Sequence, residues 1–100
     1  MGASKTHQFS DLEIGSALIA RALAHPARIK ILLLLKDHTN LRNVDLVEHL
    51  SLSRSTVNNH LTKLKDAELI ELEFHNNSYL IRKNKVESTY PAGILDQFFI

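Results

Sequence analysis

The sequence lacks cysteine and tryptophan, and its 100 residues include only three glycines and two prolines. The absence of cysteine excludes disulfides, thiolate metal sites and a cysteine nucleophile. The glycines are not clustered, so the chain has neither a P-loop nor a dinucleotide-binding fingerprint. The longest apolar run, Ile31 to Leu35, is far shorter than the roughly 20 residues that span a bilayer. Met1 to Ser10 is polar and lacks the apolar core of a secretory signal. We therefore expect a cytoplasmic protein that does not associate with a membrane and binds no cofactor. An enzyme is disfavoured.

The length and charge set two further expectations. One hundred residues form a single domain, 1–100, which is only marginally stable alone, and formation of a dimer would relieve this. The formal net charge is only +1, whereas non-specific nucleic-acid binders are usually much more basic. A DNA-binding surface on this chain would therefore need to gather its positive charge locally.

The first part of the chain carries the patterns of two helices. Ser10-Asp11-Leu12-Glu13 has the spacing of a capping box, which predicts a helix from Asp11 to about Ala24. Pro26 suits the first position of a second helix, and the run Ile29 to Leu35 marks that helix as the central one. The apolar residues of the first helix fall on two stripes, which requires two partners. The stripes are Leu12, Ile19 and Leu23, and Ile14, Leu18 and Ala22.

Two shorter helices follow, joined by the turn Ser51-Leu52-Ser53. The first starts near Asn43 or Val44, with Asn43 as its N-cap, and the second runs from Arg54 to about Ala67, with Ser53 as its N-cap. Regular helical spacing predicts an inward face on each. The inward residues are Leu46, Val47 and Leu50 on the first, and Val57, Leu61 and Leu64 on the second.

A hairpin completes the pattern. Apolar and acidic residues alternate from Ile70 to Phe74, which is the period of a half-buried strand with Phe74 inward. His75-Asn76-Asn77-Ser78 predicts a tight turn because asparagine tolerates positive φ, and Tyr79 to Lys83 forms the return strand. Two short helices followed by a hairpin predict a mainly α fold with a small β-hairpin wing, a winged helix-turn-helix. Its core spans about 11–85, and 92–100 forms a C-terminal dimerisation helix.

The chain offers more apolar surface than one small fold can hide, and an exposed patch of that size normally marks an interface. We therefore predict a homodimer. Its interface residues are Ile14, Leu18, Ile19, Ile94, Leu95, Phe98 and Phe99.

The outer face of the helix that starts at Arg54 carries the functional prediction. From Arg54 to Lys65 there are three cations and no anion, as phosphate contact requires. Its short polar groups can read base edges in the major groove of double-stranded DNA, where asparagine pairs bidentately with adenine. His60 lies nearer the buried edge and is assigned to a groove-edge or phosphate contact. The predicted DNA-binding residues are Arg54, Ser55, Thr56, Asn58, Asn59, His60, Thr62 and Lys63, together with Asn76 and Asn77 of the wing.

Two segments resemble the ArsR-type regulator family. Residues 21–32 look like that family's Leu-Ala-His-Pro-x-Arg-x-x-Ile-Leu signature, and 52–61 are similar to its recognition-helix segment. The resemblance covers roughly residues 12–85. It implies a transcriptional regulator, a repressor by expectation, that binds a palindromic operator as a symmetric dimer joined by its first and last helices.

The departures from the family pattern concern metal sensing. Many members carry a Cys-x-Cys metal site where this chain has Arg42 and Val44, and the tail supplies only Asp96 for the alternative site in the last helix. Ser51 stands where a glycine is common. We therefore predict no metal site of the usual kind, although an unconventional one with His7, His38 or His49 stays open. The sequence identifies no small-molecule effector.

Two other functions compete with DNA binding. A winged-helix module for protein–protein interaction, without sequence-specific DNA binding, is favoured by the low net charge and by the acidic residues Glu71 and Glu73. An enzyme would need a nucleophile with a base. His25 is better explained by packing or local hydrogen bonding, and His60 by a groove-edge or phosphate contact. The acid-free start of the helix at Arg54 favours DNA.

Overall fold

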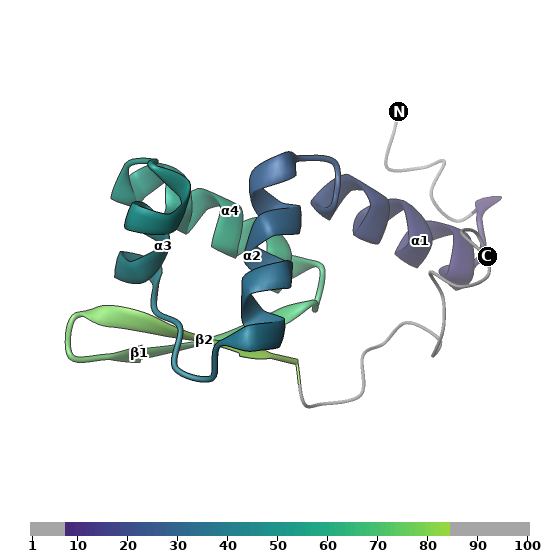
Figure 1. Cartoon of the computed structure of the whole chain (residues 1–100). Coiled ribbons are helices and arrows are strands. Elements are labelled where there is room, and N and C mark those ends of the chain that lie inside the picture. The colour runs from purple at the N-terminus through teal and green to yellow at the C-terminus, as the bar shows by residue number, and fades with distance from the viewer. Residues whose placement is uncertain (1–7, 85–100) are drawn as a thin grey trace.

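The computed structural model describes residues 8–84 and contains four helices and one antiparallel hairpin (Figure 1). The hairpin pairs β1 with β2 beside the helices, which confirms the predicted mainly α fold with a β wing. Within the described range no helix has the length and apolar character needed to cross a membrane. The elements are α1 (Asp11–Ala22), α2 (Pro26–Asp37), α3 (Asn43–Leu50), α4 (Arg54–Asp66), β1 (Ile70–His75) and β2 (Ser78–Lys83).

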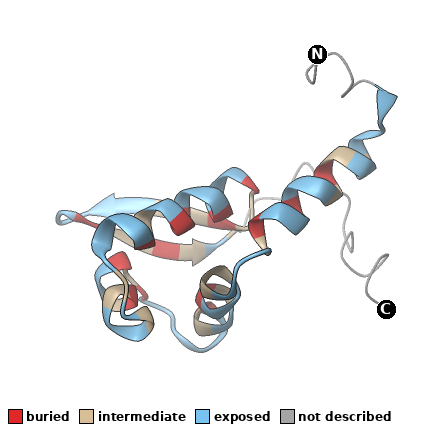
Figure 2. Cartoon of the chain, turned by 90° about the horizontal axis from the view of Figure 1, so that it is seen from above, coloured by how far each residue is buried: buried red, intermediate tan, exposed pale blue. Residues whose placement is uncertain are grey.

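Helix α1 begins with the predicted capping box. Ser10 Oγ accepts from the Glu13 amide at 3.1 Å, and the Glu13 carboxylate accepts from the Ser10 amide at 2.8 Å. The helix ends at Ala22, two residues earlier than expected, and extends away from the other elements (Figures 1 and 2). The buried residues of α1 are Gly15, Ile19 and Ala22, whereas Leu18 of the second predicted stripe is 41% exposed. The second partner for this helix stays a prediction.

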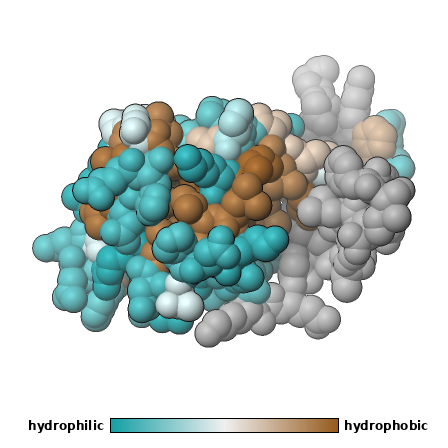
Figure 3. Space-filling view, viewed as in Figure 1, coloured by the Kyte–Doolittle hydropathy of each residue, from teal (hydrophilic) through white to brown (hydrophobic). Residues whose placement is uncertain are grey.

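Helix α2 starts at Pro26 as predicted, but it is not buried all round. The ring Nδ1 of His25, its N-cap, accepts from the Ala27 amide at 3.1 Å. Ile31 and Leu35 are buried, whereas the Leu33 side chain is 55% exposed. Figure 3 shows apolar surface over this helix in the middle of the visible face. The apolar run therefore serves the core on one side and leaves apolar surface on the other.

The core lies between α2, α3, α4 and the hairpin. The predicted seam of α4, Val57, Leu61 and Leu64, is fully buried, and Leu46 of α3 meets it there. Leu41, which precedes α3, is also buried, and its carbonyl accepts from the Ile81 amide at 2.9 Å. This contact and the bridge between residues 42 and 80 attach the start of α3 to β2.

The hairpin turn follows the sequence prediction, but one strand residue does not. Asn76 and Asn77 adopt φ values of 51° and 63°, as a two-residue hairpin turn requires. Phe74 was expected inward, yet it is 62% exposed. The outer half of the hairpin extends past the core, so Phe74 contacts Tyr79, its partner across the hairpin, edge to face at 5.1 Å.

Candidate nucleic-acid interface

Helices α3 and α4 form the predicted helix-turn-helix. Ser51 turns the chain with a left-handed φ of 55°, a conformation that favours glycine. Ser53 caps α4 as predicted, because its Oγ accepts from the Thr56 amide at 3.2 Å. The cap fixes where α4 starts and therefore which of its residues face outward.

The outward face of α4 is polar along its length. Thr62 donates its hydroxyl to the Asn58 carbonyl at 3.0 Å, which leaves the Thr62 oxygen free to accept. No anion interrupts this face before Asp66. Six of the predicted DNA-binding residues are exposed on α4: Arg54, Ser55, Thr56, Asn59, Thr62 and Lys63.

Asn58 occupies a different position from Asn59. It is half-buried on the flank of α4 that faces the hairpin, and its Oδ1 accepts from Asn43 Nδ2 at 2.9 Å. Asn43 was predicted as the N-cap of α3, but Arg42 takes that place and Asn43 points inward with 0% exposure. The Asn43 Oδ1 accepts from the Tyr79 amide at 3.0 Å. Asn43 therefore joins α3, α4 and β2 through one buried side chain.

His60 lies on the opposite flank of α4, against α2. It is 7% exposed, its Nδ1 accepts from Arg28 Nε at 3.1 Å, and its ring lies 4.4 Å from that of His25. Burial, and then the charges of His25 and Arg28, lower the pKa of His60 below its ordinary value of 6.5. This position does not suit the direct DNA contact predicted for His60, so we leave it out of the interface.

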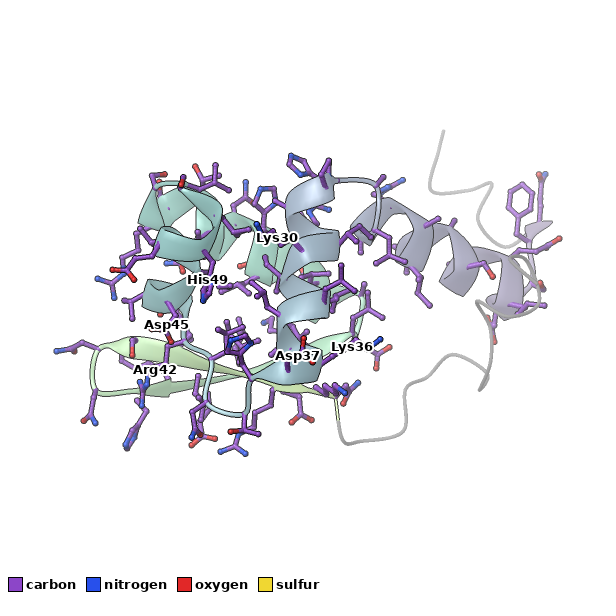
Figure 4. All side chains as sticks on the ribbon, viewed as in Figure 1. Lys30, Lys36, Asp37, Arg42, Asp45 and His49 are labelled. Carbon is purple, nitrogen blue, oxygen red and sulfur yellow. The ribbon has the colours of Figure 1, made fainter. Side chains whose placement is uncertain are left out.

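Two arginines hold the wing against the helices. Arg54 donates to the Asn77 carbonyl at 2.7 Å, and Arg42 donates to the His75 carbonyl at 3.0 Å and to the Ser78 hydroxyl. Figure 4 shows Arg42 beside the hairpin. Asn76 and Asn77 are exposed at the wing tip, next to the start of α4. Sequence reasoning missed Arg42 and Asn43 because both act through contacts with the distant hairpin.

The base of the wing carries mixed charge. Arg82 pairs with Glu73 at 3.3 Å, so one acidic residue of β1 is neutralised by a residue of β2. The wing itself thus adds little net charge to the interface. The positive charge comes mainly from α4, at Arg54, Lys63 and Lys65.

The open alternative of a histidine metal site has one candidate place among the described residues, and His7 lies outside them. His38 and His49 meet edge to face at 5.7 Å beside a cavity of about 460 Å³ between α2 and α3. Figure 4 places Asp37 and His49 on either side of this space. Among residues 8–84, however, no three histidine, cysteine or carboxylate side chains are grouped as metal ligands. The geometry gives no support for a metal centre there.

Comparison with known proteins assigns the fold and the family. A family model described as "bacterial regulatory protein, arsR family" matches residues 25–71. The structure of the cadmium metal-sensor CMTR from Mycobacterium tuberculosis is 30% identical, with a TM-score of 0.55 over 83% of this chain and 82% of that one. No curated protein matches the sequence.

Two further solved structures show the same fold at lower identity. HlyU from Vibrio cholerae is 22% identical, with a TM-score of 0.68 over 91% of this chain and 98% of that one. NolR from Sinorhizobium fredii is 19% identical, with a TM-score of 0.58 over 89% and 86%. A helix-turn-helix in a family of regulatory proteins indicates DNA-binding transcription regulation. The chain belongs to the ArsR family of bacterial regulatory proteins.

Proposed function

We propose that this protein is a sequence-specific transcriptional repressor that binds a palindromic operator as a homodimer. The observation that carries the proposal is the outer face of α4, which is N-capped at Ser53, exposed, polar and free of acidic side chains up to Lys65. Solvated surface helices more often carry Glu, Lys, Gln and Arg, which favour the helix more strongly than Asn, Ser and Thr do. Short polar groups on a protruding helix fit the major groove.

Within this face we assign two kinds of contact. Asn59, Ser55 and Thr62 point away from the core and are assigned to base edges, with Thr56 on the flank. Lys63 and Arg54 are assigned to phosphates. A guanidinium carries five N–H donors, so Arg54 can bind a phosphate while holding the Asn77 carbonyl. Asn76 and Asn77 at the wing tip are assigned to the adjoining backbone.

The dimer is proposed through α1 and the C-terminal residues. Helix α1 extends from the body, Leu18 is 41% exposed on it and Ile14 is half-buried. Ile19 is already buried within one chain and offers little free surface. The other predicted interface residues, Ile94, Leu95, Phe98 and Phe99, lie outside the described residues. Sedimentation at micromolar concentration should give a dimer, and a clean 11.3 kDa monomer would contradict this proposal.

Repression needs only occupancy of a promoter by such a dimer. Two copies related by a twofold axis place their α4 helices in successive major grooves, so the operator should be palindromic. Selecting bound genomic fragments tests this directly. We expect one enriched motif with two half-sites about one helical turn apart, and a promoter whose transcription falls when the protein is present.

Two substitutions separate base reading from phosphate binding. Asn59→Ala should cost about 1–3 kcal/mol on the selected operator and little on random DNA, because asparagine pairs specifically with adenine. Lys63→Ala should weaken binding to both and reduce the salt slope by about one. If Asn59→Ala weakened all DNA equally, the assignment of α4 to base reading would be wrong.

A protein-binding wing is the second candidate, favoured by the exposed Phe74 at the end of β1. Retention on heparin that falls steeply with salt supports the DNA-binding function. Absence of retention, together with no enriched DNA motif, would favour the protein-binding module.

A further inference from the structure

The Tyr79 amide determines which side chain donates in the hydrogen bond between Asn43 and Asn58. The Tyr79 amide can only donate, so the Asn43 atom that faces it at 3.0 Å is an oxygen. Asn43 Nδ2 must then face Asn58, at 2.9 Å, and must donate to it. The Asn58 atom at that contact is therefore its Oδ1. Because Asn43 is 0% exposed, water cannot substitute for either partner.

This polarity leaves Asn58 with hydrogen-bond donors, and no acceptor, directed away from Asn43. Its Oδ1 is directed at the buried Asn43 and accepts from it, and its Nδ2 carries two N–H donors that have no protein partner among residues 8–84. Bidentate recognition of adenine requires an asparagine to donate and accept at once. Asn59, which is exposed, has both atoms available. The two neighbouring asparagines therefore present different chemistry to DNA.

Asn58 lines a groove between α4 and the hairpin, which we call the wing groove. Its volume is about 260 Å³, and Leu61 and Leu72 supply apolar walls. Asn58 and Lys65 supply polar donors, Tyr79 also lines the groove, and the Thr62 hydroxyl proton is already used within α4. No carboxylate lines this groove among the described residues. A groove lined by a cation and neutral hydrogen-bond donors, with no carboxylate, is complementary to an anion.

We propose that the wing groove binds one phosphate of the DNA backbone. Asn58 donates to that phosphate, Lys65 neutralises it, and Asn43 is the positioning residue that holds the Asn58 amide in the donating orientation. The inference rests on the proposed function and changes one part of it. Asn58, predicted from the sequence as a base reader, becomes a phosphate contact, and base reading stays with Asn59 and its neighbours.

The first test compares substitutions at Asn58 and Asn59 by measuring Kd on the selected operator and on random duplex DNA of equal length. Asn58→Ala should weaken binding about ten- to a hundredfold on both, because one hydrogen bond to a charged group is lost everywhere. Asn58→Asp should weaken binding further on both, since it keeps the acceptor for Asn43 but adds a charge of the same sign as the phosphate. Asn59→Ala is the matched control and should affect only the operator.

The second test reverses the direction of the Asn43–Asn58 hydrogen bond. Asp at position 43 can only accept, so Asn43→Asp should draw the Asn58 Nδ2 toward itself and turn the Asn58 oxygen into the groove. We expect affinity to fall on both DNAs by at least as much as in Asn58→Ala. In the double variant Asn43→Asp with Asn58→Ala, the first change should add nothing. Protection of the Tyr79 amide against hydrogen exchange reports whether the variant is folded, and Asn58→Asp carries the test if it is not.

The outcomes distinguish this inference from the proposed function. A wild-type protein that binds no DNA overturns both. A wild-type protein that binds its operator, with Asn58→Ala weakening only that operator and relaxing one base position, overturns the phosphate assignment and leaves the proposed function standing. Unchanged affinity of a folded Asn43→Asp variant would show that Asn43 does not position Asn58.

Discussion

The two flanks of α4 bury polar side chains by different chemistry. On the wing flank, the amides of Asn43 and Asn58 connect α4 to α3 and to the Tyr79 backbone. On the α2 flank, His60 accepts from Arg28, and its ring lies against that of His25 at an interplanar angle of 56°. The first flank uses groups that do not ionise, whereas the second places an imidazole beside a guanidinium.

This difference sets what each flank responds to. The amide contacts keep the same hydrogen-bonding roles at any pH near neutrality, so the wing flank holds a constant geometry. The His60 contact requires an unprotonated Nδ1, because that atom accepts from Arg28 Nε. Arg28 also donates to the carbonyls of Arg21 and Ala22 at 3.3 and 3.4 Å, so the same side chain ties the end of α1 to α4. Protonation should therefore loosen the α1 side of the fold before the wing side.

The largest effect should come from Asn43→Ala on the wing flank. The change leaves the Tyr79 amide and the Asn58 oxygen without their buried partner, and each unsatisfied group costs about 1–3 kcal/mol. We expect the free energy of unfolding to fall by about 2–6 kcal/mol in urea titrations. The loss should be equal at pH 7.5 and pH 5.5, because no ionisable group is removed. A loss that depends on pH would break the contrast between the flanks.

Local patterns in the sequence predicted the parts of the fold that are held locally. The α4 seam followed from helical spacing, and the Ser10 and Ser53 caps and the Asn76-Asn77 turn followed from short-range backbone chemistry. These features depend on residues within a few positions of one another. They therefore leave a periodic or compositional trace that one sequence can show.

The missed features depend on contacts between distant segments. Residue type suggested Asn43 as an N-cap, but the bridge from Arg42 to β2 shifts the cap and turns Asn43 inward. Phe74 has the right period for a core residue, yet the hairpin extends beyond the core at that point. His60 was placed correctly near the buried edge, but its partner Arg28 is 32 positions away. No local spacing encodes any of these three.

A smaller effect is expected on the α2 flank, as a dependence of stability on pH. The pKa of His60 is lowered in the folded chain, so just below pH 6.5 the unfolded state binds more protons than the folded state. Stability contributed by neutral His60 is therefore complete above about pH 6.5 and falls as the pH drops below that value. His60→Asn places an amide oxygen near the position of Nδ1 and does not titrate. Its free energy of unfolding should depend less on pH between 7.5 and 5 than that of the wild type.

Asn43→Ala is the matched control for this pH experiment. It should keep the wild-type pH dependence while lowering the whole stability curve, because His60 and Arg28 are untouched. If His60→Asn instead retained the full wild-type slope, the acid response would belong to the other histidines, and the α2 flank would be as insensitive to pH as the wing flank.

The smallest effect should come from Arg54→Met, which tests whether burial or the number of hydrogen bonds gives the wing flank its stability. The Arg54 bond to the Asn77 carbonyl is short at 2.7 Å, but both residues are exposed and water can replace the guanidinium. We expect the free energy of unfolding to change by less than about 0.5 kcal/mol, as for most surface substitutions. Hydrogen exchange of the amides at the wing tip should nevertheless become faster, since the turn loses its link to α4. A stability loss as large as that of Asn43→Ala would mean that exposed bonds to the wing matter as much as the buried amide, and the contrast between the flanks would then rest on protonation alone.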